Sequence, residues 1–396
     1  MVAVLLLGAV LLVVAPLRHP LPLPTVAPVL PASMTIPGEP PALPWPRSGQ
    51  AAVTVDGLGT LGTSGGTAAV PIASVTKVMT AYVVLTDHPL KVGEQGPTLT
   101  VSARQAAAYP QEQARGESLV RVTAGAVFTE RQALQAVLLP SANNMARILA
   151  AWDAGSVDAF VAKMNATAAA LGMSKTRYTD PSGLDPDTVS TAVDQVILAR
   201  KAMALPAFAE IVAQREATLP VAGTVKNYNT LVGKDGVVGV KTGSTDEAGG
   251  CLVWAAVVRV GSVRLTIVGA VLGQPGAHTP EQLTAVFKAS RSLVRAATAA
   301  LDVQTVVRAG QAVAAVRGPI GTGTTISADG QLDVIGWPGM VVRLTADIPP
   351  VPARLAAGAE HGRLTAVAGD RPPVETALRS GALAPPSTWS RLKAHR

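Results

Sequence analysis

A serine and a lysine three residues apart, Ser74 and Lys77, are the first residues in this sequence whose types and spacing suit covalent chemistry. They open an apolar stretch with a helical pattern, so the lysine should lie one turn beyond the serine on the same helix face. A serine hydroxyl is a weak nucleophile until a base takes its proton, and a neutral lysine at that distance is such a base. Chance alone supplies about one such pair in a chain of this length, so the pair needs partners.

The second group consists of Ser141 and Asn143, which flank Ala142 directly after a predicted helix ends at Pro140. A serine–asparagine pair at this spacing is, by itself, typical of a helix cap. Beside an acylated serine, however, the hydroxyl of Ser141 suits proton relay to a leaving amine. The amide of Asn143 both donates and accepts hydrogen bonds, which suits a substrate amide.

The third group is Lys241-Thr242-Gly243, which lies on a predicted strand. The lysine and the threonine would hold a substrate carboxylate, and the glycine lets a peptide backbone lie alongside the strand. Lys241 is also the second cation that we expect to lower the pKa of Lys77. The three groups in this order, each on the element type that the chemistry requires, indicate a serine acyl-transfer site.

Composition limits the class of protein. A chain of 396 residues with 48% hydrophobic content has enough material for two domains. The formal charge of +7 suits an anionic partner such as a membrane surface or an acidic cell-wall polymer. The basic residues are scattered and aromatic residues make up only 3%, so we expect no nucleic-acid partner. The single cysteine, Cys251, excludes an intramolecular disulfide and a multi-cysteine metal site.

Residues 1–17 have the character of a signal sequence or an N-terminal membrane anchor. Residues 2–15 are uninterruptedly apolar or glycine, which is short for a bilayer span of ~20 residues but suits a secretory segment. Residues 18–47 are rich in proline and predict an extended tether. We therefore expect an exported, extracytoplasmic protein that is anchored in the membrane or secreted to the cell wall, with membrane contact through the N-terminal segment only.

Residues 48–300 predict a two-layer α/β domain, and residues 301–396 predict a small β-rich domain. Helical patterns cover residues 74–86, 129–139, 143–151, 157–171, 191–203 and 280–300. Residues 237–242, 252–259 and 263–272 have the pattern of three consecutive strands joined by short turns. Helices in the middle of the domain and an antiparallel sheet late in it favour a layered arrangement over a doubly wound parallel sheet.

The motifs and their surroundings resemble the D-alanyl-D-alanine carboxypeptidases among the low-molecular-mass penicillin-binding proteins. The similarity includes residues 72–81, 116–125, 138–144, 180–184 and 239–249, and it covers roughly residues 48–300. It implies the DD-peptidase or serine β-lactamase-like fold, an antiparallel sheet flanked by helices, here with a small C-terminal all-β domain. It also implies a serine peptidase that removes the terminal D-alanine from peptidoglycan stem peptides ending in D-Ala-D-Ala. Such an enzyme needs no metal or organic cofactor and is covalently inhibited by β-lactams.

The resemblance also assigns roles to individual residues. The catalytic group consists of Ser74, Lys77, Ser141 and Asn143. The substrate-binding group consists of Lys241, Thr242, Gly243 and Ser244. Ser74 would be the acylated nucleophile and Lys77 its proton acceptor. The backbone N–H groups of Ser74 and Ser244 would form the oxyanion hole.

Two departures from the family pattern leave alternatives open. Ala142 stands where many relatives have glycine, and residues 273–280 lack the arginine with which many relatives hold the substrate's terminal carboxylate. A DD-endopeptidase acting on peptidoglycan cross-links would use the same residues. A lactam-sensing or wall-binding domain that acylates without turnover is a further alternative. A class A β-lactamase is disfavoured, because it needs a carboxylate to activate water and no glutamate occurs between Ser141 and Ala209.

Overall fold

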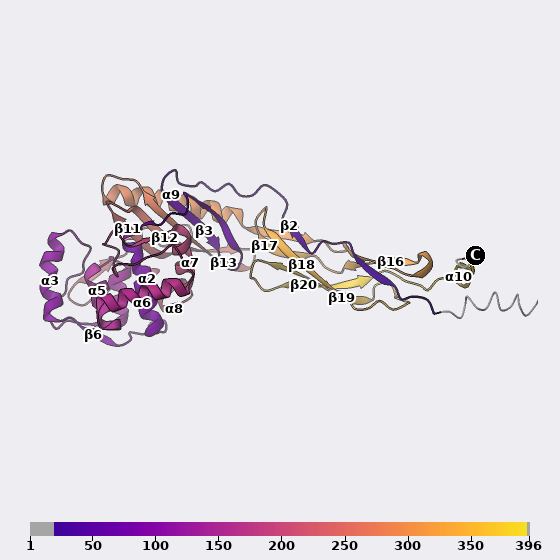
Figure 1. Cartoon of the computed structure of the whole chain (residues 1–396), viewed down its shortest axis with the longest axis horizontal. Helices are drawn as coiled ribbons and strands as arrows, with labels where there is room; N and C mark the ends of the chain where they lie inside the picture. The colour runs from indigo at the N-terminus through magenta and orange to yellow at the C-terminus, as the bar shows by residue number, and fades with distance from the viewer. Residues whose placement is uncertain (1–19, 394–396) are drawn as a thin grey trace, which may run out of the picture. The chain divides into compact units, whose positions relative to one another are not determined.

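The computed structural model describes residues 20–393, and this part of the chain forms two compact units (Figure 1). The larger unit is Ala42–Ala300, and the smaller unit consists of residues 20–41 and 301–393. The signal sequence or anchor expected at residues 1–17 lies outside the described residues. No helix within residues 20–393 is both long enough and apolar enough to cross a membrane.

The larger unit is built on a five-stranded antiparallel sheet in the order β11-β12-β13-β3-β4. Its strands are β3 (Gln50–Val55), β4 (Gly59–Ser64), β11 (Val237–Thr245), β12 (Gly249–Val260) and β13 (Val263–Gln274). Three short antiparallel pairs join β5 (Val70–Pro71) to β8 (Val189–Ser190), β6 (Thr98–Thr100) to β7 (Val127–Thr129), and β9 (Glu216–Leu219) to β10 (Gly223–Lys226).

Helices cover both faces of this sheet. They are η1 (Ala73–Thr76), α2 (Lys77–Asp87), α3 (Ala103–Ala114), α4 (Glu130–Leu138), α5 (Asn143–Ala154), α6 (Val157–Ala170), α7 (Ala192–Met203), α8 (Pro206–Val212) and α9 (Thr279–Ala300). Helix α9 packs on β12 and β13 on one face of the sheet, and α7 packs on β13 and β3 on the other face (Figure 1). Strands β12 and β13 are consequently buried along most of their length, as expected for strands covered on both faces. The predicted antiparallel sheet with flanking helices is confirmed.

Helix α2 is the centre of the helical layer, and it contacts α4, α5, α6, α7 and α8. Most of its residues are buried, because a helix that is apolar on nearly all sides can only be stable inside a core. Lys77, its first residue, is fully buried with them. The fold therefore holds a lysine at the N-terminus of a central helix, next to the edge of the sheet that β11 forms.

The smaller unit is rich in antiparallel strands, which confirms the predicted β-rich C-terminal part. A seven-stranded sheet has the order β1-β15-β16-β20-β19-β18-β2, and β14 pairs with β17. The elements are β1 (Thr25–Pro28), β2 (Ser33–Thr35), β14 (Asp302–Val307), β15 (Ala312–Arg317), η2 (Pro319–Gly321), β16 (Gly323–Ala328), β17 (Leu332–Gly336), β18 (Val341–Asp347), β19 (Glu360–Ala368), β20 (Val374–Ser380) and α10 (Thr388–Lys393).

The prediction of an extended proline-rich tether over residues 18–47 is wrong for the segments 25–28 and 33–35. The first is β1, which pairs with β15, and the second is β2, which pairs with β18. Both are terminal strands of the sheet, where proline is tolerated because one edge of the strand needs no hydrogen-bond partner. Proline content alone therefore did not distinguish a free tether from two edge strands.

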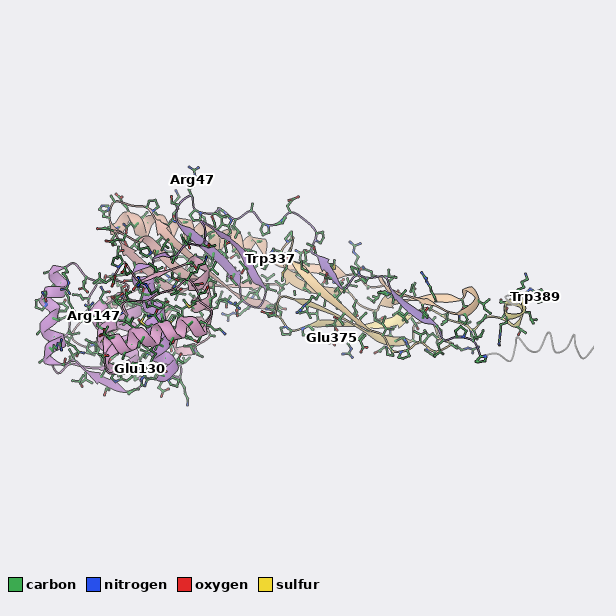
Figure 2. All side chains as sticks on the ribbon, in the orientation of Figure 1. Arg47, Glu130, Arg147, Trp337, Glu375 and Trp389 are labelled. Carbon is green, nitrogen blue, oxygen red and sulfur yellow. The ribbon has the colours of Figure 1, made fainter. Side chains whose placement is uncertain are left out.

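Glu130 is a buried acid whose titration should make stability depend on pH. It is the first residue of α4, is 0% exposed, and neither carboxylate oxygen has a hydrogen-bond partner among the described residues (Figure 2). Burial, followed by the nearby charges of Glu94 and Asp153, raises the pKa of this carboxyl from 4.5 to about 7. The folded chain holds the Glu130 proton more tightly than the unfolded chain does. The contribution of this proton to the free energy of unfolding is therefore complete below pH 4.5 and is lost as pH rises through 7.

We expect Glu130→Gln to remove this pH dependence. Thermal unfolding at pH 5 and pH 8 should show that the wild-type chain loses about 2 kcal/mol, or about 4 °C in Tm, more than the variant over that range. The comparison uses the change between the two pH values, so any constant cost of burying the amide cancels. Equal losses in both proteins would contradict a buried, titrating Glu130.

Candidate active site

Ser74 and Lys77 meet where the short helix η1 passes into α2. Lys77 Nζ lies 2.7 Å from Ser74 Oγ, while the serine itself is half-buried and the lysine is fully buried. Ala73, just before the serine, has a φ of 47°, a conformation that non-glycine residues adopt only when their surroundings enforce it. A base is therefore held in hydrogen-bonding contact with a hydroxyl that solvent can still reach.

The surroundings of Lys77 favour its neutral form. Burial, and then the positive charge of Lys241, hold the pKa of Lys77 well below its usual range, and Asp180 only partly opposes this effect. Lys77 Nζ also lies 2.7 Å from Asn143 Oδ1, at the start of α5, and 2.8 Å from the Ser182 carbonyl oxygen. A neutral amine held beside a hydroxyl in this way can accept the proton of that hydroxyl.

The turn that begins at Asp180 supplies one of these contacts. The Asp180 carboxylate accepts hydrogen bonds from the backbone N–H groups of Ser182 and Gly183 at 3.0 and 2.9 Å, which fixes the turn. A side chain at Gly183 would collide with the Ala73 carbonyl oxygen, so glycine allows the turn to pack directly behind Ser74. Residues 180–184 were among those that carry the family resemblance, but the contact between Ser182 and Lys77 was not predicted.

Strand β11 brings the third motif against Ser74. A Cβ atom on Gly243 would lie 3.0 Å from both the Ser74 backbone nitrogen and the Ile72 carbonyl oxygen, so a side chain there would crowd the Ser74 backbone and glycine permits the close approach. Lys241 is buried, and this burial lowers its pKa to about 7. Lys241 Nζ donates to the Thr242 carbonyl oxygen at 3.0 Å, and Thr242 is also buried.

Ser141 lies in the loop between α4 and α5 with a φ of 66°. Its side chain is buried, and its hydroxyl has no hydrogen-bond partner among residues 20–393. Asn143 contacts Lys77 directly, whereas no hydrogen bond joins the Ser141 side chain to either lysine in the described part of the chain. Its hydroxyl thus remains available to donate or accept a proton.

Ser244, the last of the predicted site residues, is held by α9. Its hydroxyl donates to Gln282 Oε1 and lies 3.1 Å from Thr279 Oγ1. Gln282 Nε2 donates to the Gly276 carbonyl oxygen at 3.3 Å, which fixes the amide so that its oxygen faces the serine. Gln282 was not predicted as part of the site, and it lies just beyond residues 273–280, where the expected arginine is missing.

The family model and the individual relatives that match this sequence agree with one another. A sequence model of the peptidase S11 family, D-alanyl-D-alanine carboxypeptidase, matches residues 54–275. A D-alanyl-D-alanine endopeptidase of Pseudomonas aeruginosa is 36% identical over 208 residues, which are 51% of this chain and 64% of that protein. D-alanyl-D-alanine carboxypeptidase DacB2 of Mycobacterium tuberculosis is 38% identical over 193 residues, 47% of this chain and 62% of that protein. The chain thus spans less than two thirds of the length of these relatives.

Solved structures agree with the sequence matches. The crystal structure of the Streptomyces K15 DD-transpeptidase is similar with a TM-score of 0.54 and 30% identity, covering 63% of this chain and 98% of that one. The D-alanyl-D-alanine carboxypeptidase DacD of Francisella tularensis shares the fold with a TM-score of 0.59 at 20% identity, covering 87% of this chain and 95% of that one. The resemblance drawn from the motifs is confirmed, and the chain belongs to the peptidase S11 family, D-alanyl-D-alanine carboxypeptidase.

Proposed function

We propose that this chain is a serine-type D-alanyl-D-alanine carboxypeptidase that removes the terminal D-alanine from peptidoglycan stem peptides. The observation that carries the proposal is the 2.7 Å contact between Lys77 Nζ and Ser74 Oγ, with Gly243 of β11 packed against the Ser74 backbone. Membership of the S11 family supports the substrate class. The larger unit, Ala42–Ala300, contains every candidate active-site residue that the proposal uses.

The first chemical step acylates Ser74. Lys77 takes the hydroxyl proton as Ser74 Oγ attacks the carbonyl carbon of the penultimate D-alanine, and the backbone N–H groups of Ser74 and Ser244 stabilise the oxyanion. The bond to the terminal D-alanine then breaks, and the proton that Lys77 took passes through the Ser141 hydroxyl to the leaving amine, which restores neutral Lys77. Asn143 binds the substrate amide. The second step is attack of water on the ester, which releases the shortened peptide and restores Ser74.

Substrate recognition would rest on the strand β11. The carboxylate of the terminal D-alanine fits beside Lys241, Thr242 and Ser244, and Gly243 leaves room for the peptide backbone. β-Lactams, whose ring carbonyl would be attacked by the same serine, are expected to act as covalent inhibitors. Such a substrate requires an extracytoplasmic site of action, and contact with the membrane would involve residues 1–17.

Product analysis with two substrates tests this proposal. We expect release of free D-alanine from a soluble pentapeptide that ends in D-Ala-D-Ala, and no cleavage of a cross-linked muropeptide dimer. Covalent labelling by a fluorescent penicillin without release of any product would instead favour a lactam-sensing or wall-binding domain. Absence of both labelling and product release would contradict an acyl-transfer site at Ser74.

A DD-endopeptidase is the second candidate, and the Ser244 contact favours it. The Ser244 hydroxyl is already engaged by Gln282 and lies 3.1 Å from Thr279 Oγ1, so it would contribute less to holding a terminal carboxylate. Residues 273–280 supply no arginine to compensate. Relatives from Pseudomonas aeruginosa and Escherichia coli carry the name D-alanyl-D-alanine endopeptidase. Cleavage of the muropeptide dimer in the same experiment would move the assignment to this activity.

A further inference from the structure

A buried carboxylate, Glu117, lies against the active-site asparagine. Asn143 Nδ2 donates to Glu117 Oε2 at 3.2 Å, and the side chain of Glu117 is only 1% exposed. Arg147 and Arg115 pair with the same carboxylate at 2.8 and 2.7 Å. Arg147 also pairs with Glu112 at 2.7 Å, so two acids and two arginines form one network beside Asn143. Figure 2 shows Arg147 among the helices of the larger unit.

The carboxylate determines which way the Asn143 amide faces. A carboxylate oxygen only accepts hydrogen bonds, so Glu117 must meet the Nδ2 group of the amide. The carbonyl oxygen Oδ1 is thereby turned to Lys77, where it lies 2.7 Å from Nζ. Asn143 and Arg147 are four residues apart on α5, on one face of the helix, so the same helix face presents both partners to Glu117.

This orientation matters for the proton that Lys77 receives. A neutral amine has two N–H bonds and one lone pair. Asn143 Oδ1 and the Ser182 carbonyl oxygen only accept, so they take the two N–H bonds. The lone pair is left for the remaining neighbour, the Ser74 hydroxyl at 2.7 Å. A reversed amide would instead bring an N–H group toward Lys77 and compete for that lone pair.

We propose that Glu117 is a positioning residue for acylation, which holds the Asn143 amide so that the lone pair of Lys77 faces Ser74. The inference rests on the proposed function. Burial raises the pKa of the Glu117 carboxyl, but Arg147 and Arg115 outweigh this effect and hold the pKa below its usual range. A carboxylate with a lowered pKa is a poor base, so Glu117 suits a positioning role better. Residues 141–209 contain no glutamate. Glu117, which precedes the Ser141 motif in the sequence, nevertheless brings a carboxylate to Asn143.

The charge of Glu117 also provides a specific readout. The groups that act electrostatically on Lys77 are Lys241 and Arg147, which lower its pKa, and Asp180 and Glu117, which raise it. Replacing Glu117 with glutamine removes a negative charge and leaves Arg147 less compensated. Both effects lower the pKa of Lys77 further, so the fraction of neutral lysine at acidic pH should rise.

The experiment measures the second-order rate constant for acylation by a fluorescent penicillin as a function of pH. In Glu117→Gln, whose amide oxygen can still accept from Asn143, we expect the acid limb of the profile to move to lower pH and the plateau to stay within about threefold of wild type. In Glu117→Leu, which has no acceptor, we expect the plateau to fall by about ten- to a hundredfold. Glu117→Asp should recover part of that loss.

Glu112→Gln is the matched control, because it also removes an acid from Arg147, whereas Asn143 Nδ2 donates to Glu117 and not to Glu112 among the described residues. It should leave the plateau unchanged. A plateau in Glu117→Leu that stays within about threefold of wild type, or an equal fall of the plateau in Glu112→Gln and Glu117→Leu, would overturn the positioning role. An acid limb that does not move in Glu117→Gln would contradict the effect of the Glu117 charge on Lys77. If Glu117→Leu does not fold, Glu117→Ala, which also lacks an acceptor for Asn143 Nδ2, takes its place and should show the same fall of the plateau. A wild-type chain that penicillin does not acylate at any pH would overturn the proposed function and this inference with it.

Discussion

Replacing Lys77 with arginine is expected to reduce acylation by penicillin by about 10³-fold or more. A guanidinium stays protonated at any accessible pH, so it has no lone pair with which to take the Ser74 proton. The positive charge is preserved, which separates loss of the base from loss of a charge in the site. Stopped-flow or gel-based labelling with a fluorescent penicillin measures the effect.

Because Lys77 is fully buried, its replacement needs a check on folding. Circular dichroism and thermal unfolding of Lys77→Arg serve this purpose, and Lys201→Arg, at an exposed position of α7, is the matched control with wild-type labelling expected. A folded Lys77→Arg protein that is acylated at the wild-type rate would show that another group takes the proton.

Replacing Ser74 with alanine should remove both penicillin labelling and release of D-alanine, with a loss of more than about 10³-fold. The substitution deletes only the hydroxyl, and the half-buried position leaves no large cavity behind. Chromatographic detection of free D-alanine after incubation with a D-Ala-D-Ala pentapeptide measures the loss.

Ser292→Ala, at an exposed position of α9, is the control for this substitution and should behave as the wild-type protein. The same protein preparation should be tested for noncovalent binding of the pentapeptide, which Ser74→Ala is expected to retain. Continued D-alanine release by a homogeneous Ser74→Ala sample would mean that a different nucleophile, or a bound hydrolytic water, performs the reaction.

Local sequence patterns predicted those elements whose signals lie within one segment. The helical pattern over residues 129–139 predicted α4, and Thr129 caps this helix in a reciprocal arrangement with Gln132 at its start. The three late strands were predicted because their apolar runs are separated by short turns, and they form β11, β12 and β13. Helix α3 was not predicted, since Pro110 interrupts its pattern. The strands β1 and β2 were missed because their partners lie about three hundred residues away along the chain.

The candidate site likewise combines residues that local motifs predicted with contacts that only the tertiary structure shows. Residue types and order were enough to select Ser74, Lys77 and the β11 motif, because each chemistry needs particular side chains on particular elements. The contacts that tune them depend on loops from elsewhere in the chain. The Ser182 carbonyl oxygen, Glu117 and Gln282 each reach the site through tertiary packing, so no local pattern indicated their roles.

Every proposed role in the site depends on acylation of Ser74, and peptide mapping of the wild-type chain can locate the acylated residue. The protein is incubated with penicillin, digested, and analysed by tandem mass spectrometry. We expect one penicilloyl adduct, located on Ser74 in the peptide that also contains Lys77 or ends at it. An adduct on Ser141 or on any other residue, or an unmodified Ser74 in a folded protein, would contradict acylation of Ser74.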